Sequence, residues 1–80
     1  MKKVLKFQAS WCGPCKMLSK TFSQIKTDIE VEEIDVDANP DLTTQYRVRG
    51  VPTFVLLEND VELKRFVGVK SKEEIENWLA

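Results

Sequence analysis

Apolar and polar residues alternate along this chain in short blocks that predict strands and helices in turn. The first block, residues 4–7, is short and apolar, as expected for a strand. It is followed by a stripe of apolar residues at helical spacings of three and four, made up of Cys15, Leu18, Phe22 and Ile25. Residues 29–36 then form a second β-prone block. A strand, a helix and a strand in this order predict a βαβ unit with a parallel strand pair.

The middle of the chain is less regular than its beginning. Within residues 29–36 the apolar alternation slips between Val31 and Ile34, which a β-bulge or a later strand start would explain. Further on, Asn39 is a typical capping residue and Pro40 suits a first helical turn. We therefore expect a short second helix that begins there and ends near residue 46.

The last third of the chain predicts a hairpin and a closing helix. Strands over residues 53–57 and 61–67 flank a turn in which Asn59 and Asp60 tolerate the positive φ that such turns require. Ser71 opens a capping box before a last helix, whose expected inward residues are Ile75, Trp78 and Leu79. The complete order is βαβαββα. It predicts an α/β fold with a four-stranded mixed sheet flanked by three helices on both faces.

Composition narrows the class of protein. Eighty residues predict one domain, residues 1–80, and a net charge of −1 gives no electrostatic case for nucleic acid or for an anionic membrane. The start lacks the apolar core of a signal peptide, and no segment approaches the roughly 20 apolar residues of a membrane span. We expect a cytoplasmic protein, in a compartment where disulfides are usually transient and catalytic. A monomer is the default expectation.

The two cysteines, Cys12 and Cys15, are the strongest chemical signal, and the chain has no histidine. A zinc site needs about four Cys, His or carboxylate ligands, so this pair alone argues against a metal. A structural disulfide is the simpler alternative, but closing so small a ring removes little chain entropy. A C-x-x-C pair near a βαβ pattern instead favours redox chemistry.

Four motifs in order resemble those of the thioredoxin family over nearly the whole chain. They are WCGPCK at residues 11–16, DVDANP at residues 35–40, RGVPTF at residues 49–54 and the glycine Gly68 after the last strand. The family's opening βα unit is missing, so the chain resembles a minimal thioredoxin of about glutaredoxin size. The resemblance implies a thiol–disulfide oxidoreductase with no cofactor.

On this resemblance Cys12 is the nucleophile, because a helix start favours a thiolate. Cys15, further into the helix and more buried, is the resolving cysteine that attacks Cys12 in the mixed disulfide. Gly13 and Pro14 bring no positive group to the pair. We therefore expect a reducing couple, nearer the about −270 mV of thioredoxin than the about −120 mV of a strong oxidant.

The resemblance also assigns substrate-binding positions. Val51-Pro52 is expected to have a cis peptide bond facing the cysteines, although most X-Pro bonds are trans and a trans proline could simply open the strand. Backbone groups of Val51 would then hold an extended substrate segment. Trp11 is expected to form an exposed docking face rather than to fill the core, and Gly68 completes the substrate-binding set.

Lys6 is where the chain departs from the family. A typical thioredoxin buries there, six residues before its first active-site cysteine, an aspartate that accepts the proton of the resolving cysteine. The lysine partner of that aspartate aligns with Glu33, so both charges are exchanged. Either the two form a reversed internal ion pair, or both reach solvent from strand ends. An internal pair would favour thiolates and make Glu33 a candidate proton acceptor for Cys15.

Three functions remain open at this point. The leading one is a reductase of disulfide-containing substrate proteins, recharged by thioredoxin reductase. A glutathione-dependent, glutaredoxin-like enzyme is the second, although the chain has neither the Cys-Pro-Tyr-Cys site nor the paired glycines of those proteins. The third is a redox-independent binding subunit of a larger assembly.

Overall fold

The computed structural model describes residues 1–80 and contains seven elements in the predicted order. They are β1 (Lys2–Gln8), α1 (Gly13–Ser23), β2 (Glu30–Asp35), α2 (Pro40–Gln45), β3 (Thr53–Glu58), β4 (Val61–Val67) and α3 (Lys72–Leu79). The strands form a single sheet in the order β2-β1-β3-β4. β1 and β2 are parallel, and the other two neighbouring pairs are antiparallel. The predicted fold class, βαβαββα with a mixed four-stranded sheet, is therefore confirmed.

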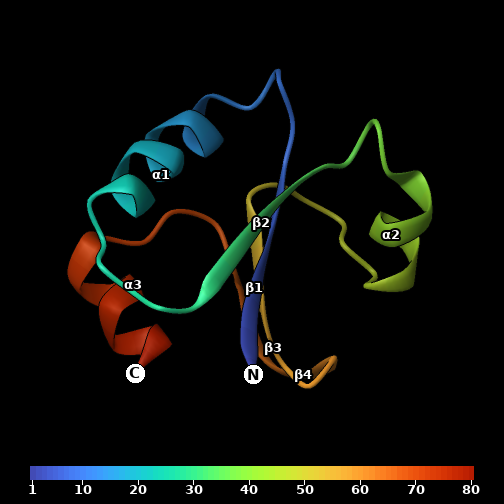
Figure 1. The fold of residues 1–80 in the computed structure, drawn as a ribbon. Coiled ribbons are helices and arrows are strands. Elements are labelled where there is room, and N and C mark those ends of the chain that lie inside the picture. The colour runs from blue at the N-terminus through green and yellow to red at the C-terminus, as the bar shows by residue number, and fades with distance from the viewer.

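The sheet lies between two layers of helix, with α1 and α3 on one face and α2 on the other (Figure 1). Each face buries its own apolar cluster, because successive side chains of a strand point to opposite faces. The cluster beneath α1 and α3 contains Val4, Leu18, Phe54, Leu56, Phe66, Ile75 and Leu79. The cluster beneath α2 contains Leu5, Phe7, Ile34, Val55 and Leu57. β1 and β3, which contribute to both clusters, are the central strands that position the cysteine loop.

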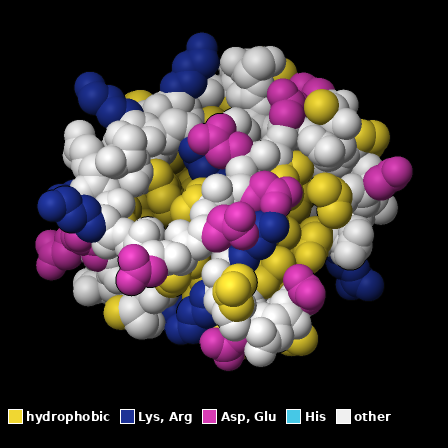
Figure 2. Space-filling model, viewed as in Figure 1, with side chains coloured by type: hydrophobic (Ala, Val, Ile, Leu, Met, Phe, Trp, Pro, Cys, Tyr) yellow, Lys and Arg dark blue, Asp and Glu magenta, His cyan; other side chains and the backbone are white.

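β2 is an edge strand, and charged side chains cover it. Figure 2 shows acidic and basic groups along the middle of the face on which β2 lies, bordered on both sides by hydrophobic side chains. Lys3 of β1 pairs there with Glu30 and Glu32. Charges of this kind protect an open strand edge against pairing with another chain.

No β-bulge causes the slip in the apolar alternation of β2. The β1–β2 register runs without interruption from Lys3↔Glu30 to Gln8↔Asp35, and the irregularity of the sheet lies instead between β3 and β4, at Leu56 and Leu57. The apolar pattern slips because Glu33 occupies a position on the face that packs against α1. Ile29 lies just before the strand.

Most local signals are confirmed, and one is wrong. Asn59 and Asp60 adopt positive φ in the hairpin turn, and Ser71 forms both hydrogen bonds of its capping box with Glu74. Asn39 does not cap α2 with its side chain; its Nδ2 donates instead to the carbonyl of Asp35 at 3.0 Å. The Asn39 side chain thus ties the α2 start to the end of β2.

Three positions expected on the inner faces of the helices, Phe22, Ile25 and Trp78, are only partly buried. Ile25 lies beyond the end of α1, yet still packs against the cluster beneath that helix. Trp78 meets Phe66 edge-to-face with the ring centroids 4.9 Å apart, and it closes the same cluster at its rim. None of the three helices has the length and apolar composition needed to cross a lipid bilayer.

Candidate active site

The cysteine pair lies where the chain passes from the end of β1 into α1. Cys12 is the N-cap of the helix, with extended backbone angles, and its Sγ accepts a hydrogen bond from the backbone N–H of Cys15 at 3.2 Å. Pro14 fits the first turn because its missing N–H would have no partner there. Cys12 and Cys15 form a disulfide, with their Cα atoms 5.3 Å apart. The N–H of Cys15 at the helix start therefore points at the sulfur of Cys12.

Both sulfur-bearing residues are buried in this oxidised form. Cys12 is 5% exposed and Cys15 is 2% exposed, so overall burial separates them little. They form a small cluster with Ala9, against which Val36 and Val51 pack. What separates the two is their place on the helix, because Cys12 precedes the first turn and Cys15 lies within it.

The loop before β3 faces this pair. The Val51-Pro52 peptide bond is cis, as the resemblance implied. Neither the N–H nor the C=O of Val51 takes part in a hydrogen bond within the protein, whereas the carbonyl of Pro52 accepts one from the N–H of Gly68 at 3.0 Å. Gly68 has a φ of +96°, which lies in the region that favours glycine. The backbone of Val51 is thus available to an extended peptide, and Gly68 supports the loop behind it.

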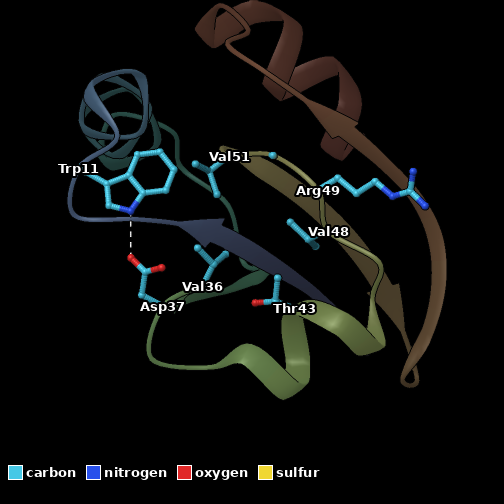
Figure 3. Close-up of a pocket in the computed structure, with 8 residues that line it drawn as sticks. Trp11, Val36, Asp37, Thr43, Val48, Arg49 and Val51 are labelled. Atoms are coloured by element: carbon cyan, nitrogen blue, oxygen red, sulfur yellow. Dashed lines mark hydrogen bonds between the residues drawn. The ribbon is translucent and has the colours of Figure 1, made fainter.

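A groove of about 270 Å³ opens beside the disulfide. In Figure 3, Trp11 and Val51 face each other across one end of this groove, while Val36, Thr43 and Val48 lie along it. The indole N–H of Trp11 donates to Oδ2 of Asp37 at 2.9 Å, which fixes the ring at the edge of the groove. Trp11 remains 68% exposed. A large aromatic face held in one orientation suits docking of another molecule.

Lys6 lies beneath the site, on the face of β1 that packs against α1. Its side chain is 1% exposed, and its Nζ contacts Oγ of Ser19 and lies 3.6 Å from Oε1 of Glu33. Burial lowers the pKa of the Lys6 ammonium below its ordinary value, and the nearby Glu33 carboxylate opposes that change. The structure therefore brings Lys6 and Glu33 together, with the cation inside and the anion near the surface.

Glu33 is much more accessible than Lys6. Its side chain is 57% exposed, and its Oε2 accepts a hydrogen bond from Nε2 of Gln8 at 2.8 Å. Glu33 and Lys6 border one cavity of about 310 Å³, whereas Cys15 borders a different one of about 260 Å³. Ser19 borders both cavities and is the link between Lys6 and the cysteine side.

The sequence reasoning missed three residues that the structure places at the site. Asp37 holds the Trp11 ring, Ser19 contacts Lys6, and Gln8 binds Glu33. Two of them carried a signal: Asp37 lies inside the DVDANP motif, and Ser19 lies four residues after Cys15, on the same helix face. No group of three or more His, Cys, Asp or Glu side chains is close enough together to hold a metal ion.

Comparisons with known proteins point to one family. The sequence model of the thioredoxin family matches residues 1–80. A thioredoxin of Mycobacterium tuberculosis is 40% identical over 70 residues, covering 82% of this chain and 60% of its own length. A protein of Mycobacterium leprae described as a bifunctional thioredoxin reductase/thioredoxin is 37% identical over 70 residues, covering 82% of this chain and 15% of its own length.

A solved structure gives the same result. A mutant thioredoxin from Halobacterium salinarum superimposes with a TM-score of 0.91 at 37% identity, over 96% of this chain and 70% of that one. Although the fold agrees closely, the chain spans only about 60% of the length of the mycobacterial thioredoxin that it matches.

Proposed function

This chain belongs to the thioredoxin family, and from that membership we propose that it is a protein-disulfide reductase working through Cys12 and Cys15. One observation carries the proposal: a Cys-Gly-Pro-Cys disulfide caps a helix and faces a loop whose Val51 backbone is free of hydrogen bonds. In its reduced dithiol form the cysteine pair supplies the electrons, and the Val51 backbone holds an extended chain beside it. A structural disulfide would need neither the groove nor the free backbone.

The first step is attack by Cys12. In the reduced protein, the helix start favours its thiolate over the thiol. A substrate segment adds to the free N–H and C=O of Val51 as a short extra strand, and Trp11 covers one side of it. The Cys12 thiolate attacks one sulfur of the substrate disulfide. A mixed disulfide forms, and the other substrate sulfur leaves as a thiolate.

The second step releases the substrate. Cys15 loses its proton and attacks the sulfur of Cys12, which restores the disulfide seen here and frees the second substrate thiol. Gly13 and Pro14 keep the two sulfurs within one helical turn and add no charge of their own. Pro52 and Gly68 shape the loop that the substrate meets, because Pro52 brings no N–H and its carbonyl is occupied by Gly68.

Lys6 and Glu33 are proposed to tune this couple. A cation beneath the site favours thiolates electrostatically, which makes the pair less reducing than it would be without Lys6. We therefore expect Lys6→Ala to lower the reduction potential and Glu33→Ala to raise it, because Glu33 partly neutralises Lys6. Equilibration of each variant with a glutathione buffer measures the potential, and unchanged potentials in both variants would reject the role.

The proposed partners are disulfide-containing proteins and a thioredoxin reductase as electron donor. The second is supported by the Mycobacterium leprae relative, whose name joins a reductase and a thioredoxin in one chain. A reductase of this kind works where thiols are kept reduced, so we propose a cytoplasmic location. We also propose that the protein is a monomer.

Insulin-disulfide reduction driven by NADPH tests the function. Thioredoxin reductase is compared with glutathione plus glutathione reductase as the donor, and we expect turnover with the first system only. Turnover with glutathione alone would instead favour the glutaredoxin-like alternative. A Cys12→Ser/Cys15→Ser variant with full biological activity would favour the binding-subunit alternative.

Substrate trapping tests the roles of the two cysteines. Cys15→Ser is expected to accumulate mixed disulfides with substrate proteins, because the second step is blocked. Cys12→Ser is the matched control and should trap nothing. The opposite pattern would reverse the assignment of nucleophile and resolving cysteine.

A further inference from the structure

The resolving step needs a proton acceptor for Cys15, and Lys6 cannot serve while it is charged. The open pocket of about 260 Å³ that Cys15 borders shows which groups are available. Its lining includes four polar side chains besides Lys16, namely those of Gln8, Ser10, Ser19 and Asp35. Asp35 is the only carboxylate among the lining residues.

Local structure holds the Asp35 carboxylate in place. Asp35 ends β2, directly beside Gln8 of β1 in the strand register. Its Oδ1 accepts hydrogen bonds from the backbone N–H groups of Asp37 at 2.8 Å and Ala38 at 3.4 Å. Its Oδ2 has no hydrogen-bond partner within the protein. One oxygen therefore anchors the side chain in a turn, and the other is free to accept a proton.

Glu33 is less well placed for the same task. Its carboxylate is engaged by Lys6 and Gln8, is largely exposed, and borders the cavity on the far side of Ser19. A proton from Cys15 would have to pass Ser19 to reach it. From Cys15 to Asp35 there is a single continuous cavity, large enough for water.

We propose that Asp35 accepts the proton of Cys15, through water in this cavity, during the second step of disulfide reduction. The inference rests on the proposed function and names the base for its resolving step. Ser19, which contacts Lys6 and borders the same cavity, places a hydroxyl beside the path. Lys6 acts through Ser19 as a positioning residue and supplies the positive charge.

The step balances in atoms and charge. The Cys15 S–H bond breaks, and its proton passes by way of water to the Asp35 carboxylate, which becomes a carboxylic acid. The Cys15 thiolate forms the S–S bond with Cys12, while the bond between Cys12 and the substrate sulfur breaks. Cys12 and Cys15 are oxidised by two electrons in total, and the substrate disulfide is reduced. The substrate thiolate takes a proton from solvent, and Asp35 returns its proton to solvent.

Few charged groups lie around the proposed proton path from Cys15 to Asp35. Lys16 of α1 and Asp35 itself border the cavity, Lys6 lies behind Ser19, and Glu33 is held at the surface by Gln8. Asp37, just beyond β2, is turned toward Trp11. Asp35 is therefore the only anion facing Cys15 from this side.

Stopped-flow absorbance with an aromatic disulfide that releases a coloured thiolate at each step tests the proposal. The first phase depends on reagent concentration and reports attack by Cys12. The second phase is independent of concentration and reports resolution by Cys15. The variant is Asp35→Asn, whose amide oxygen can still accept from the N–H groups of Asp37 and Ala38. Glu32→Gln, which removes one exposed carboxylate from the same strand, is the matched control, and Glu33→Gln tests the alternative acceptor.

We expect Asp35→Asn to leave the first phase within about twofold and to slow the second phase by roughly a hundredfold near pH 7, the usual size of general-base catalysis. The two proteins should converge at alkaline pH, where Cys15 ionises without help. Glu32→Gln should change the second phase by less than about threefold at every pH, because only an exposed charge outside the site is lost. A purely structural defect would slow the reaction without this convergence.

An unchanged second phase in Asp35→Asn, or an equal loss in Glu33→Gln, overturns the proposal. If Asp35→Asn folds poorly by circular dichroism, Asp35→Ser is used, since a serine hydroxyl can also accept from the turn N–H groups but is no base at neutral pH. The absence of a first phase in the wild-type protein, or its persistence in Cys12→Ser, would instead refute the proposed function itself.

Discussion

Replacing the buried Lys6 with methionine is expected to stabilise the protein, and the structure allows the size of the effect to be worked out. Methionine matches lysine in being long and unbranched, so it can fill the same space. The aliphatic part of Lys6 already borders a cavity with apolar walls from Phe22, Ile25 and Val31. The substitution therefore removes an ammonium group and leaves the packing in place.

Two opposing contributions decide how Lys6→Met changes the free energy of unfolding. Removing the charge of a side chain that is 1% exposed relieves its desolvation. Replacing buried ion pairs by apolar residues has often stabilised proteins by roughly 1–4 kcal/mol. Against this stands the loss of the contact with Glu33, which at 57% exposure contributes at most about 1 kcal/mol. Neither partner is stranded, because Glu33 keeps Gln8 and water, and Ser19 can donate to a helix carbonyl. The net expectation is a gain of roughly 1–3 kcal/mol at pH 7.

The pH dependence gives this prediction its specific signature. Burial lowers the pKa of Lys6 in the folded protein below its ordinary value of 10.5. The unfolded chain then binds the proton more tightly, so the cost of the charge is fully present below the lowered pKa. It disappears as the pH rises through the window up to 10.5. The advantage of Lys6→Met should therefore shrink across that window, by no more than about 1.4 kcal/mol per pH unit for one proton.

Urea unfolding followed by circular dichroism measures both quantities. Wild type and Lys6→Met are compared in the oxidised form at a series of pH values from neutral to above the ordinary lysine value. Lys26→Met, at an exposed position in the loop after α1, is the control for loss of one positive charge. A destabilised Lys6→Met at pH 7, or a stability difference that does not change with pH, would refute the reasoning from burial.

Three further predictions each concern a single residue. Ser71→Ala should lower the free energy of unfolding by about 1 kcal/mol, because the helix start loses its cap; unchanged urea midpoints would contradict this. Gly68→Ala should cost about 1 kcal/mol through its φ of +96° alone, since a new Cβ there meets nothing within 4 Å; thermal unfolding measures it, and Val67→Ala is the neighbouring control. Asp37→Asn should leave Trp11 less firmly held and raise KM for insulin several-fold at constant kcat, whereas a fall in kcat would place Asp37 in the chemistry.

Local signals predicted the elements because they act within a few residues. The capping box at Ser71 and the positive-φ turn at Asn59 needed no knowledge of the rest of the chain. Asn39 failed for the opposite reason. Its side chain is drawn away from α2 by the Asp35 carbonyl, a group that becomes available only where β2 ends.

The site was predictable in its chemistry and less so in its surroundings. Cys12, Cys15 and the cis Val51-Pro52 bond lie in contiguous motifs, so the resemblance located them directly. The sequence alone placed neither Ser19 nor Asp35, because their relation to Cys15 depends on how α1 packs over β2. A register shift of one residue in β2 would turn Asp35 to the other face of the sheet.

A typical thioredoxin uses one buried aspartate for a task that, on our proposals, this chain divides between Lys6 and Asp35. Such an aspartate both sets the local charge and accepts the proton of the resolving cysteine. On our proposals, the cation at Lys6 stabilises thiolates in this chain, while the proton goes to Asp35 at the end of the neighbouring strand. The two effects should then separate in experiment. Lys6→Met should lower the reduction potential and move the alkaline limb of the second phase to higher pH, without the roughly hundredfold loss near pH 7 expected for Asp35→Asn. If both substitutions alter the profile in the same way, the task is not divided, and Lys6 belongs to the proton path itself.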